Sequence, residues 1–240
     1  MRELKARYRG SVLGFLWTFL NPTLLMLAYA MVFSVFMKQQ MKNYLFFLFI
    51  GLLPWIAFST SVGVGASAIS DRRDLLTKVR FPAQVLPTTV VATNTCNYLL
   101  SLPLMIALGG YFGIWPSWHS IAFPLILAIQ ILFTLALSYF ISALNVAFRD
   151  LQYIVANVLT LWFFATPVLY PPTAIPAGFR EIALLSNPMA ALVTSYQSIF
   201  YEHAIPPLRP LLVALIISLA LFWISAQIFE RRSEEFAELV

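Results

Sequence analysis

Long apolar stretches, separated by short charged or proline-rich segments, dominate the pattern of the chain. About 20 consecutive apolar residues are enough for a helix to cross the hydrocarbon core of a bilayer. The pattern therefore predicts six membrane-spanning helices, at residues 12–37, 44–69, 83–109, 119–148, 151–169 and 208–229. A cleaved signal peptide is an alternative for the first, because Ala28-Tyr29-Ala30 has the small residues of a cleavage site. We prefer a retained span, because the apolar run continues well beyond that site.

The charged run at residues 70–82 separates the second and third predicted spans. Its ionisable residues are Asp71, Arg72, Arg73, Asp74, Lys78 and Arg80. Asp71 can cap a short helix, and Asp74 three residues later fits a loose capping box. Three apolar side chains follow at helical spacing, Leu75, Leu76 and Val79, and Pro82 ends the helix. Two interpretations remain open: a solvated loop whose cations anchor the topology, or a docking helix for a soluble partner.

The segment at residues 170–207 is proline-rich yet still apolar. Two short helices fit it, at residues 177–185 and 189–201, and each is too short to span a bilayer. Apolar helices that are interrupted by proline and do not span are typical of re-entrant or interfacial segments. We therefore predict such a segment before the last span.

The two ends of the chain are charged. Residues 1–11 carry Arg2, Lys5, Arg7 and Arg9, with Leu4 and Tyr8 on one helical face. This pattern indicates an interfacial helix on an anionic leaflet, or a segment that only sets the orientation of the chain. Residues 230–240 form a charged tail.

The composition indicates the class of protein. Of the 240 residues, 60% are hydrophobic and 10% are charged, whereas a soluble domain has roughly 25% charged residues. The chain is therefore predicted to be an all-α integral membrane protein with a single transmembrane domain.

The distribution of cations predicts the orientation. With both termini in the cytoplasm, the inner segments hold eleven cations, Arg2, Lys5, Arg7, Arg9, Arg72, Arg73, Lys78, Arg80, Arg149, Arg231 and Arg232. The outer segments hold four, Lys38, Lys42, Arg180 and Arg209. This bias follows the positive-inside rule, so residues 70–82 are predicted to be cytoplasmic and residues 170–207 to face outward.

The sequence argues against several chemistries. No predicted span has an acid or base near its middle, which argues against a proton- or sodium-coupled carrier, although ion sites built from carbonyl groups remain possible. No Gly-x-x-x-x-Gly-Lys-Ser/Thr loop is present to hold ATP phosphates. His119 and His203 are isolated, so we expect no metal site, and we find no catalytic residues. An ATP-hydrolysing partner docked on residues 71–80 would supply the energy, and a homodimer would enclose a wide path between two copies.

Several stretches, in the same order along nearly the whole chain, carry a family resemblance. They are residues 4–14 with Leu16-Trp17 and Asn21-Pro22, residues 78–82 with Val85-Leu86-Pro87, Phe148-Arg149-Asp150-Leu151, residues 166–171, and Asn187-Pro188-Met189. Together they resemble type 2 ABC transporter permeases that export lipid-linked polysaccharide, a family that includes O-antigen, capsule and wall teichoic acid exporters. One departure is the arm before Tyr8, which at seven residues is shorter than we expect for the family.

The resemblance implies a complex of two permease and two ATPase subunits in a bacterial cytoplasmic membrane, with ATP and Mg²⁺ bound by the ATPase. It implies that Asp71, Arg72, Arg73, Asp74, Leu75, Lys78 and Arg80 belong to a coupling helix, and that residues 1–11 lie beside the ATPase. Residues 170–201 would hold outward gate helices. It further implies a channel whose aromatic side chains contact sugar rings, for which the candidates are Trp17, Tyr29, Trp55, Phe58, Tyr98 and Phe163. These residues are chosen only because they are aromatic and lie within predicted spans. The alternative is that they face lipid or neighbouring helices instead of a channel.

The expected function is export of an undecaprenyl-linked polysaccharide such as O-antigen, with capsule or wall teichoic acid as alternatives within the family. A permease for a small lipid or drug would use the same docking helix. A carrier or channel without ATP, and a membrane scaffold that binds partners through the apolar outer segment, are rival classes.

Overall fold

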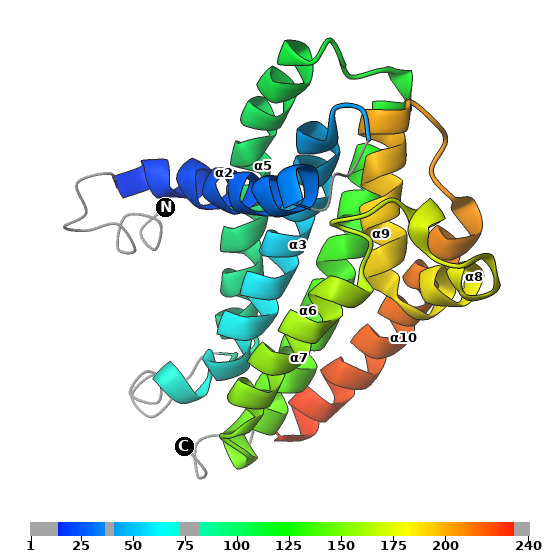
Figure 1. Ribbon diagram of the computed structural model, residues 1–240. Helices are drawn as coiled ribbons and strands as arrows, with labels where there is room; N and C mark the ends of the chain where they lie inside the picture. The colour runs from blue at the N-terminus through cyan, green and yellow to red at the C-terminus, as the bar shows by residue number, and fades with distance from the viewer. Residues whose placement is uncertain (1–13, 37–40, 73–81, 233–240) are drawn as a thin grey trace.

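The computed structural model describes residues 14–36, 41–72 and 82–232, and every regular element in these ranges is a helix. The α-helices are α2 (Trp17–Ala30), α3 (Tyr44–Ser67), α5 (Val85–Tyr111), α6 (Phe123–Ala147), α7 (Leu151–Ala165), α8 (Ala177–Ser186), α9 (Pro188–Gln197) and α10 (Leu208–Arg232) (Figure 1). Short 3-10 helices cover Gly14–Leu16, Ser70–Arg72, Trp118–Ala122 and Pro172–Ala174, and π-helical turns cover Met31–Phe36 and Ser198–Glu202. The predicted all-helical class is confirmed.

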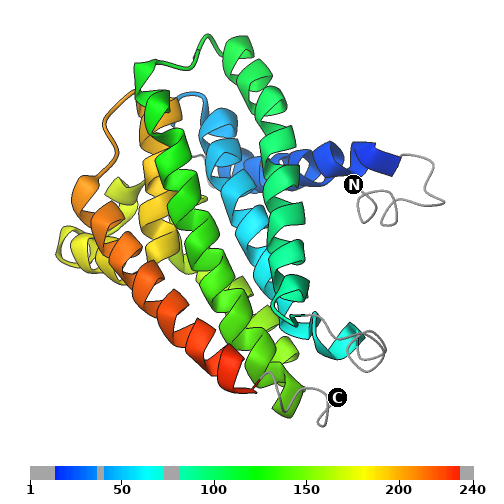
Figure 2. The same cartoon turned by 180° about the vertical axis from the view of Figure 1, so that it is seen from behind.

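Helix α3 forms the centre of the bundle. It contacts α2, α5, α6, α7 and α9, and most of its side chains are buried. Figure 2 shows α3, α5, α6 and α10 running side by side along the long direction of the molecule. A helix that is predominantly apolar on all its faces is expected where neighbouring helices surround it on several sides.

Four helices are long and apolar enough to cross a membrane: Tyr44–Ser67, Val85–Tyr111, Trp118–Ala147 and Leu208–Arg232. They lie in the second, third, fourth and sixth predicted spans. The first and fifth predicted spans contain shorter apolar helices instead, Trp17–Phe33 and Leu151–Ala165. The described residues therefore show four helices of spanning length, not six.

Helix α2 differs most from the prediction. It lies across the long helices instead of along them (Figure 1), with Pro22 and Met26 buried. The prediction of a span over residues 12–37 rests on apolar composition, which does not distinguish a helix that crosses the bilayer from one that packs across other helices.

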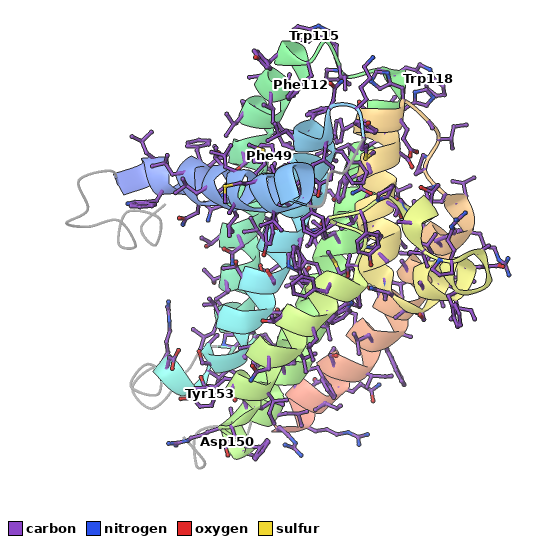
Figure 3. All side chains as sticks on the ribbon, in the orientation of Figure 1. Phe49, Phe112, Trp115, Trp118, Asp150 and Tyr153 are labelled. Carbon is purple, nitrogen blue, oxygen red and sulfur yellow. The ribbon has the colours of Figure 1, made fainter. Side chains whose placement is uncertain are left out.

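The two ends of the bundle have different chemistry. Trp115 and Trp118 lie at one end, and Asp150 and Tyr153 lie at the opposite end (Figure 3). Trp115 and Trp118 are 63% and 71% exposed, as expected of aromatic side chains at head-group depth. We refer to these as the Trp115 end and the Asp150 end.

The proline-rich segment contains two helices of opposite character. Every residue of α9 is buried, whereas α8 has no buried residue. Helix α9 begins at Asn187-Pro188, where the Asn187 side chain accepts a hydrogen bond from the Ala190 amide at 3.1 Å, a typical helix N-cap with proline in the first turn. Because α9 is buried, its apolar side chains are not available as a scaffold's binding surface.

Gly51 allows α9 to approach α3 closely. A Cβ atom at this position would lie 2.9 Å from Gln197 Nε2 and 3.3 Å from Val193 Cγ1. We expect Gly51→Ala to lower the free energy of unfolding by about 1–3 kcal/mol, because the added methyl group overpacks a buried contact. Gly63→Ala on the same helix is the control, since its Cβ would meet Leu159 Cδ1 at 3.9 Å, ordinary van der Waals contact. Thermal unfolding of the purified variants in detergent measures the difference, and equal midpoints would contradict this packing.

Candidate substrate-binding grooves

A groove of about 410 Å³ lies between α2, α3 and α5. We call it the polar groove. It is lined by Trp17, Thr18, Asn21, Pro22, Leu53, Ile56, Ala57, Thr60, Asn94, Asn97, Tyr98 and Ser101. Most of these side chains carry a hydroxyl, amide or indole group, and none of the twelve is charged.

Helix α5 supplies two of the three side-chain amides of the polar groove, and Asn21 of α2 supplies the third. The Asn94 amide donates to the Val90 carbonyl at 3.1 Å, and the Ser101 hydroxyl donates to the Asn97 carbonyl at 2.9 Å. The side-chain oxygen of Asn97 is buried and has no hydrogen-bond partner among the described residues. A buried polar atom without a partner is costly, so turning toward the groove would let this oxygen accept a hydrogen bond from a ligand hydroxyl.

A second groove, of about 370 Å³, lies between α2, α3 and α7. We call it the apolar groove. Its lining is Leu25, Tyr29, Leu52, Trp55, Ile56, Ser59, Thr60, Leu159, Thr160, Phe163 and Phe164. Ile56 and Thr60 line both grooves, so the two grooves meet at this part of α3.

Five of the six aromatic candidates line one of the two grooves, and the sixth lines neither. Trp17 and Tyr98 line the polar groove, and Tyr29, Trp55 and Phe163 line the apolar groove. The Phe163 ring centroid lies 5.3 Å from that of Tyr29 and 5.5 Å from that of Trp55. Phe58 is fully buried, lines neither groove and packs on Phe133 at 5.7 Å. We therefore assign Phe58 to the core and retain the other five as candidates.

A buried hydrogen-bonded network lies behind Tyr98. The Gln130 side chain donates to the Pro54 carbonyl at 2.9 Å and accepts from the Tyr196 hydroxyl at 2.8 Å. The Tyr196 ring lies 5.9 Å from the Tyr98 ring. Polar bonds of this kind hold helices together where no water is available, so α3, α6 and α9 are fixed behind the polar groove.

The described part of the predicted coupling helix is Ser70–Arg72. Asp71 and Arg72 are exposed, and the Asp71 carboxylate accepts a hydrogen bond from the Ser67 hydroxyl at 2.7 Å. Because Ser67 is the last residue of α3, this bond joins Asp71 to the end of that helix. Arg73, Asp74, Leu75, Lys78 and Arg80 lie outside the described residues, as do Arg2, Lys5, Arg7 and Arg9 of the predicted interfacial helix.

Helix α8 is held to its surroundings by charged side chains. Glu181 pairs with Arg209 of α10, and the Arg180 guanidinium donates to the Thr173 and Ile175 carbonyls at 3.0 and 3.2 Å. Nearby, burial raises the pKa of the Tyr170 hydroxyl, which donates to the Phe164 carbonyl. Within the described ranges, no three His, Cys, Asp or Glu side chains gather to hold a metal ion.

The sequence interpretation missed the amides. It considered charged groups and aromatic rings within the spans, and the polar groove contains no Asp, Glu, Lys, Arg or His. A signal was present nonetheless: Asn94, Asn97 and Ser101 recur at helical spacing on one face of an apolar stretch.

Comparison with known proteins identifies the family. The model of the ABC-2 type transporter family matches residues 1–201, and the chain belongs to this family. The O-antigen export system permease protein RfbA of Myxococcus xanthus is 64% identical over 240 residues, which cover 100% of this chain and 92% of that protein. A protein of the same name from Klebsiella pneumoniae is 31% identical with the same coverage. The polysialic acid transport protein KpsM of Escherichia coli is 23% identical over 199 residues, covering 80% and 76% of the two chains.

Proposed function

We propose that this chain is the permease subunit of an ABC transporter that exports lipid-linked polysaccharide of the O-antigen class across the bacterial cytoplasmic membrane. The observation that carries this proposal is the end-to-end similarity, at 64% identity, to a protein named as an O-antigen export permease. In this role the chain is a transport subunit and not an enzyme, and its partner subunit binds ATP and Mg²⁺.

The chemistry of the polar groove supports a carbohydrate substrate. Sugar rings present neutral hydroxyl groups at their edges and apolar C–H groups on their faces. Amides such as Asn97 suit the hydroxyl groups, and rings such as Trp17 and Tyr98 suit the apolar faces. A groove without charged side chains would also let successive units of a polymer leave as readily as they enter.

The proposed topology has both termini in the cytoplasm. Arg72, Arg149 and Arg231 lie in segments that the orientation prediction assigns to the inner side, and Trp115 lies at the opposite end of the bundle. In this topology the four helices of spanning length cross the membrane, and a homodimer encloses the path between its two subunits. The ATPase docks at residues 70–82, and residues 1–11 lie beside it.

Capsule polysaccharide is the alternative cargo within the family. The similarity to the polysialic acid transport protein supports it, but that similarity is 23% and covers 80% of this chain. The O-antigen relative is matched over the whole chain at nearly three times that identity. We therefore favour O-antigen over capsule.

A cysteine scan tests the docking of the ATPase. With single cysteines at Ser70, Asp71 and Arg72 in a Cys96→Ala background, we expect crosslinks to the co-expressed ATPase whose yield changes with ATP. These positions begin the predicted coupling helix, and Asp71 and Arg72 are exposed. Trp115→Cys and Trp118→Cys are the controls, because both are exposed at the opposite end. Crosslinks at the Trp115 end alone would reverse the proposed orientation. No crosslinks from 70–72 in an intact complex would contradict the docking site.

A further inference from the structure

Each end of α7 is hydrogen-bonded to an asparagine side chain outside that helix, Asn145 of α6 at its start and Asn187, the N-cap of α9, at its end. We propose that α7 is a strut that transmits motion from the ATPase docking segment to the grooves and to α9, and that Asn145 and Asn187 are the positioning residues that fix its two ends. This inference rests on the proposed function, because it explains how the energy of a separate ATPase reaches the transport path.

Asn145 forms the tie at the Asp150 end. It lies near the end of α6 and is only 1% exposed. Its amide nitrogen donates to the Ser70 hydroxyl at 3.1 Å, and its carbonyl oxygen accepts from the Gln152 backbone amide at 3.1 Å. Ser70 begins the docking segment, and Gln152 belongs to the first turn of α7. One side chain therefore joins the docking segment to the beginning of α7.

This tie also acts as a helix cap. The first amides of a helix lack partners within it, and Asp150, which precedes α7, makes no side-chain cap hydrogen bond. Asn145 supplies an acceptor from α6 instead. The start of α7 is thus fixed by a residue that also bonds the docking segment, so a displacement of Ser70 is felt at the start of α7.

Asn187 forms the tie at the other end. Its carbonyl oxygen accepts from the Trp162 indole at 2.9 Å and from the Ala190 amide at 3.1 Å. Its amide nitrogen donates to the Thr166 hydroxyl at 3.1 Å. Trp162 lies in the last turn of α7, Thr166 follows that helix, and Ala190 lies in the first turn of α9. The residue that caps α9 is therefore bonded to the end of α7.

Between these ties, α7 is attached by a narrow stripe. Its buried residues are Val155, Leu159 and Phe163, spaced four apart on one face. Two of them, Leu159 and Phe163, also line the apolar groove. A helix of 15 residues is about 22 Å long. Each end of α7 is bonded to a neighbouring segment, and only one stripe of the helix is packed, so α7 can tilt as a rigid body when those segments move. A tilt changes the width of the apolar groove and the position of α9 together.

The test uses the complex of this chain with its ATPase in proteoliposomes. The measured quantity is the number of lipid-linked glycans moved per ATP hydrolysed. Asn145→Ala breaks the tie at the Asp150 end, and Trp162→Phe removes only the indole donor at the other end while retaining a ring. For each variant we expect this ratio to fall by about tenfold, the size of effect that corresponds to losing one or two hydrogen bonds. Basal ATP hydrolysis should stay within about twofold of the wild type, since the transmission and not the ATPase is damaged.

Ser142→Ala is the matched control. Ser142 lies on α6, one turn before Asn145, is fully buried, and donates within its own helix to the Tyr139 carbonyl. We expect it to leave the ratio unchanged. Should Asn145→Ala fail to assemble, Ser70→Ala removes one bond of the same tie, and Trp162→Phe tests the other end independently.

The outcomes separate this inference from the function on which it rests. The strut alone would be overturned if the wild-type complex moves glycan and the variants keep its ratio of glycan moved to ATP hydrolysed. The variants that decide this are Trp162→Phe and Asn145→Ala, or Ser70→Ala in place of the latter. Equal losses in Ser142→Ala and Asn145→Ala would also overturn it, because the effect would then be general destabilisation of α6. A wild-type complex that moves no glycan would instead remove the proposed function.

Discussion

The Thr60→Trp substitution is expected to reduce glycan export strongly. Thr60 lies on α3 where the polar and apolar grooves meet, and it lines both. An indole at this point would project into grooves of about 410 and 370 Å³. Because steric overlap of an added bulky group costs up to about 3 kcal/mol, we expect the rate of ATP-dependent glycan movement to fall by up to about a hundredfold. The measurement is glycan movement by proteoliposomes that contain the variant and its ATPase.

Cys96→Trp controls for the presence of a new indole. Cys96 is exposed on α5 and lines neither groove, so we expect near wild-type rates. Basal ATP hydrolysis and the elution volume of the complex should be unchanged in both variants. Full export by an assembled Thr60→Trp complex would show that the substrate does not pass through these grooves.

The Gln130→Leu substitution is expected to destabilise the subunit by about 2–4 kcal/mol. The Gln130 amide bonds both the Pro54 carbonyl and the Tyr196 hydroxyl, and all three residues are buried. Leucine removes the Gln130 acceptor of the Tyr196 hydroxyl, which then has only the neighbouring Tyr98 hydroxyl to bond. A buried group that loses its acceptor costs about 1–3 kcal/mol in addition to the lost bonds. The free energy of unfolding is measured by denaturant titration of the detergent-purified subunit.

Adding Tyr196→Phe to Gln130→Leu should restore part of the lost stability. The double variant also removes the hydroxyl that loses its Gln130 acceptor in the single variant, and replacing both partners by apolar groups is much less costly than replacing one. The expected coupling between the two positions is about 1–2 kcal/mol. Additive effects of the two substitutions would show that the bond between these side chains contributes nothing to the core.

Sequence patterns were most informative where local chemistry determines the structure. Pro176 precedes α8, and Asn187-Pro188 begins α9, so the two short helices could be predicted within a few residues of where they lie. The charged run at 70–82 could also be assigned to a connection between helices, because its residue types differ sharply from the apolar stretches on either side.

Sequence patterns were least informative where the packing of distant segments determines the structure. An apolar run does not reveal that α2 lies across α3 and α5, because lipid and neighbouring helices present the same apolar surroundings. The polar groove likewise combines Thr18 and Asn21 of α2, Thr60 of α3, and Asn97 of α5. These residues are up to about 80 positions apart in the sequence, and only the crossing of the three helices brings them together.

The central claim is tested most directly by ATP-dependent movement of lipid-linked O-antigen across a membrane. Proteoliposomes containing this chain and its co-purified ATPase would be loaded with the lipid-linked glycan, and an antibody outside the vesicles would detect glycan that reaches the outer leaflet. The account predicts an increase in detected glycan that requires ATP, is absent from vesicles without this chain, and is strongly reduced in Thr60→Trp but not in Cys96→Trp. Glycan that moves equally well without ATP, or a complex that hydrolyses ATP and moves no glycan, would contradict it.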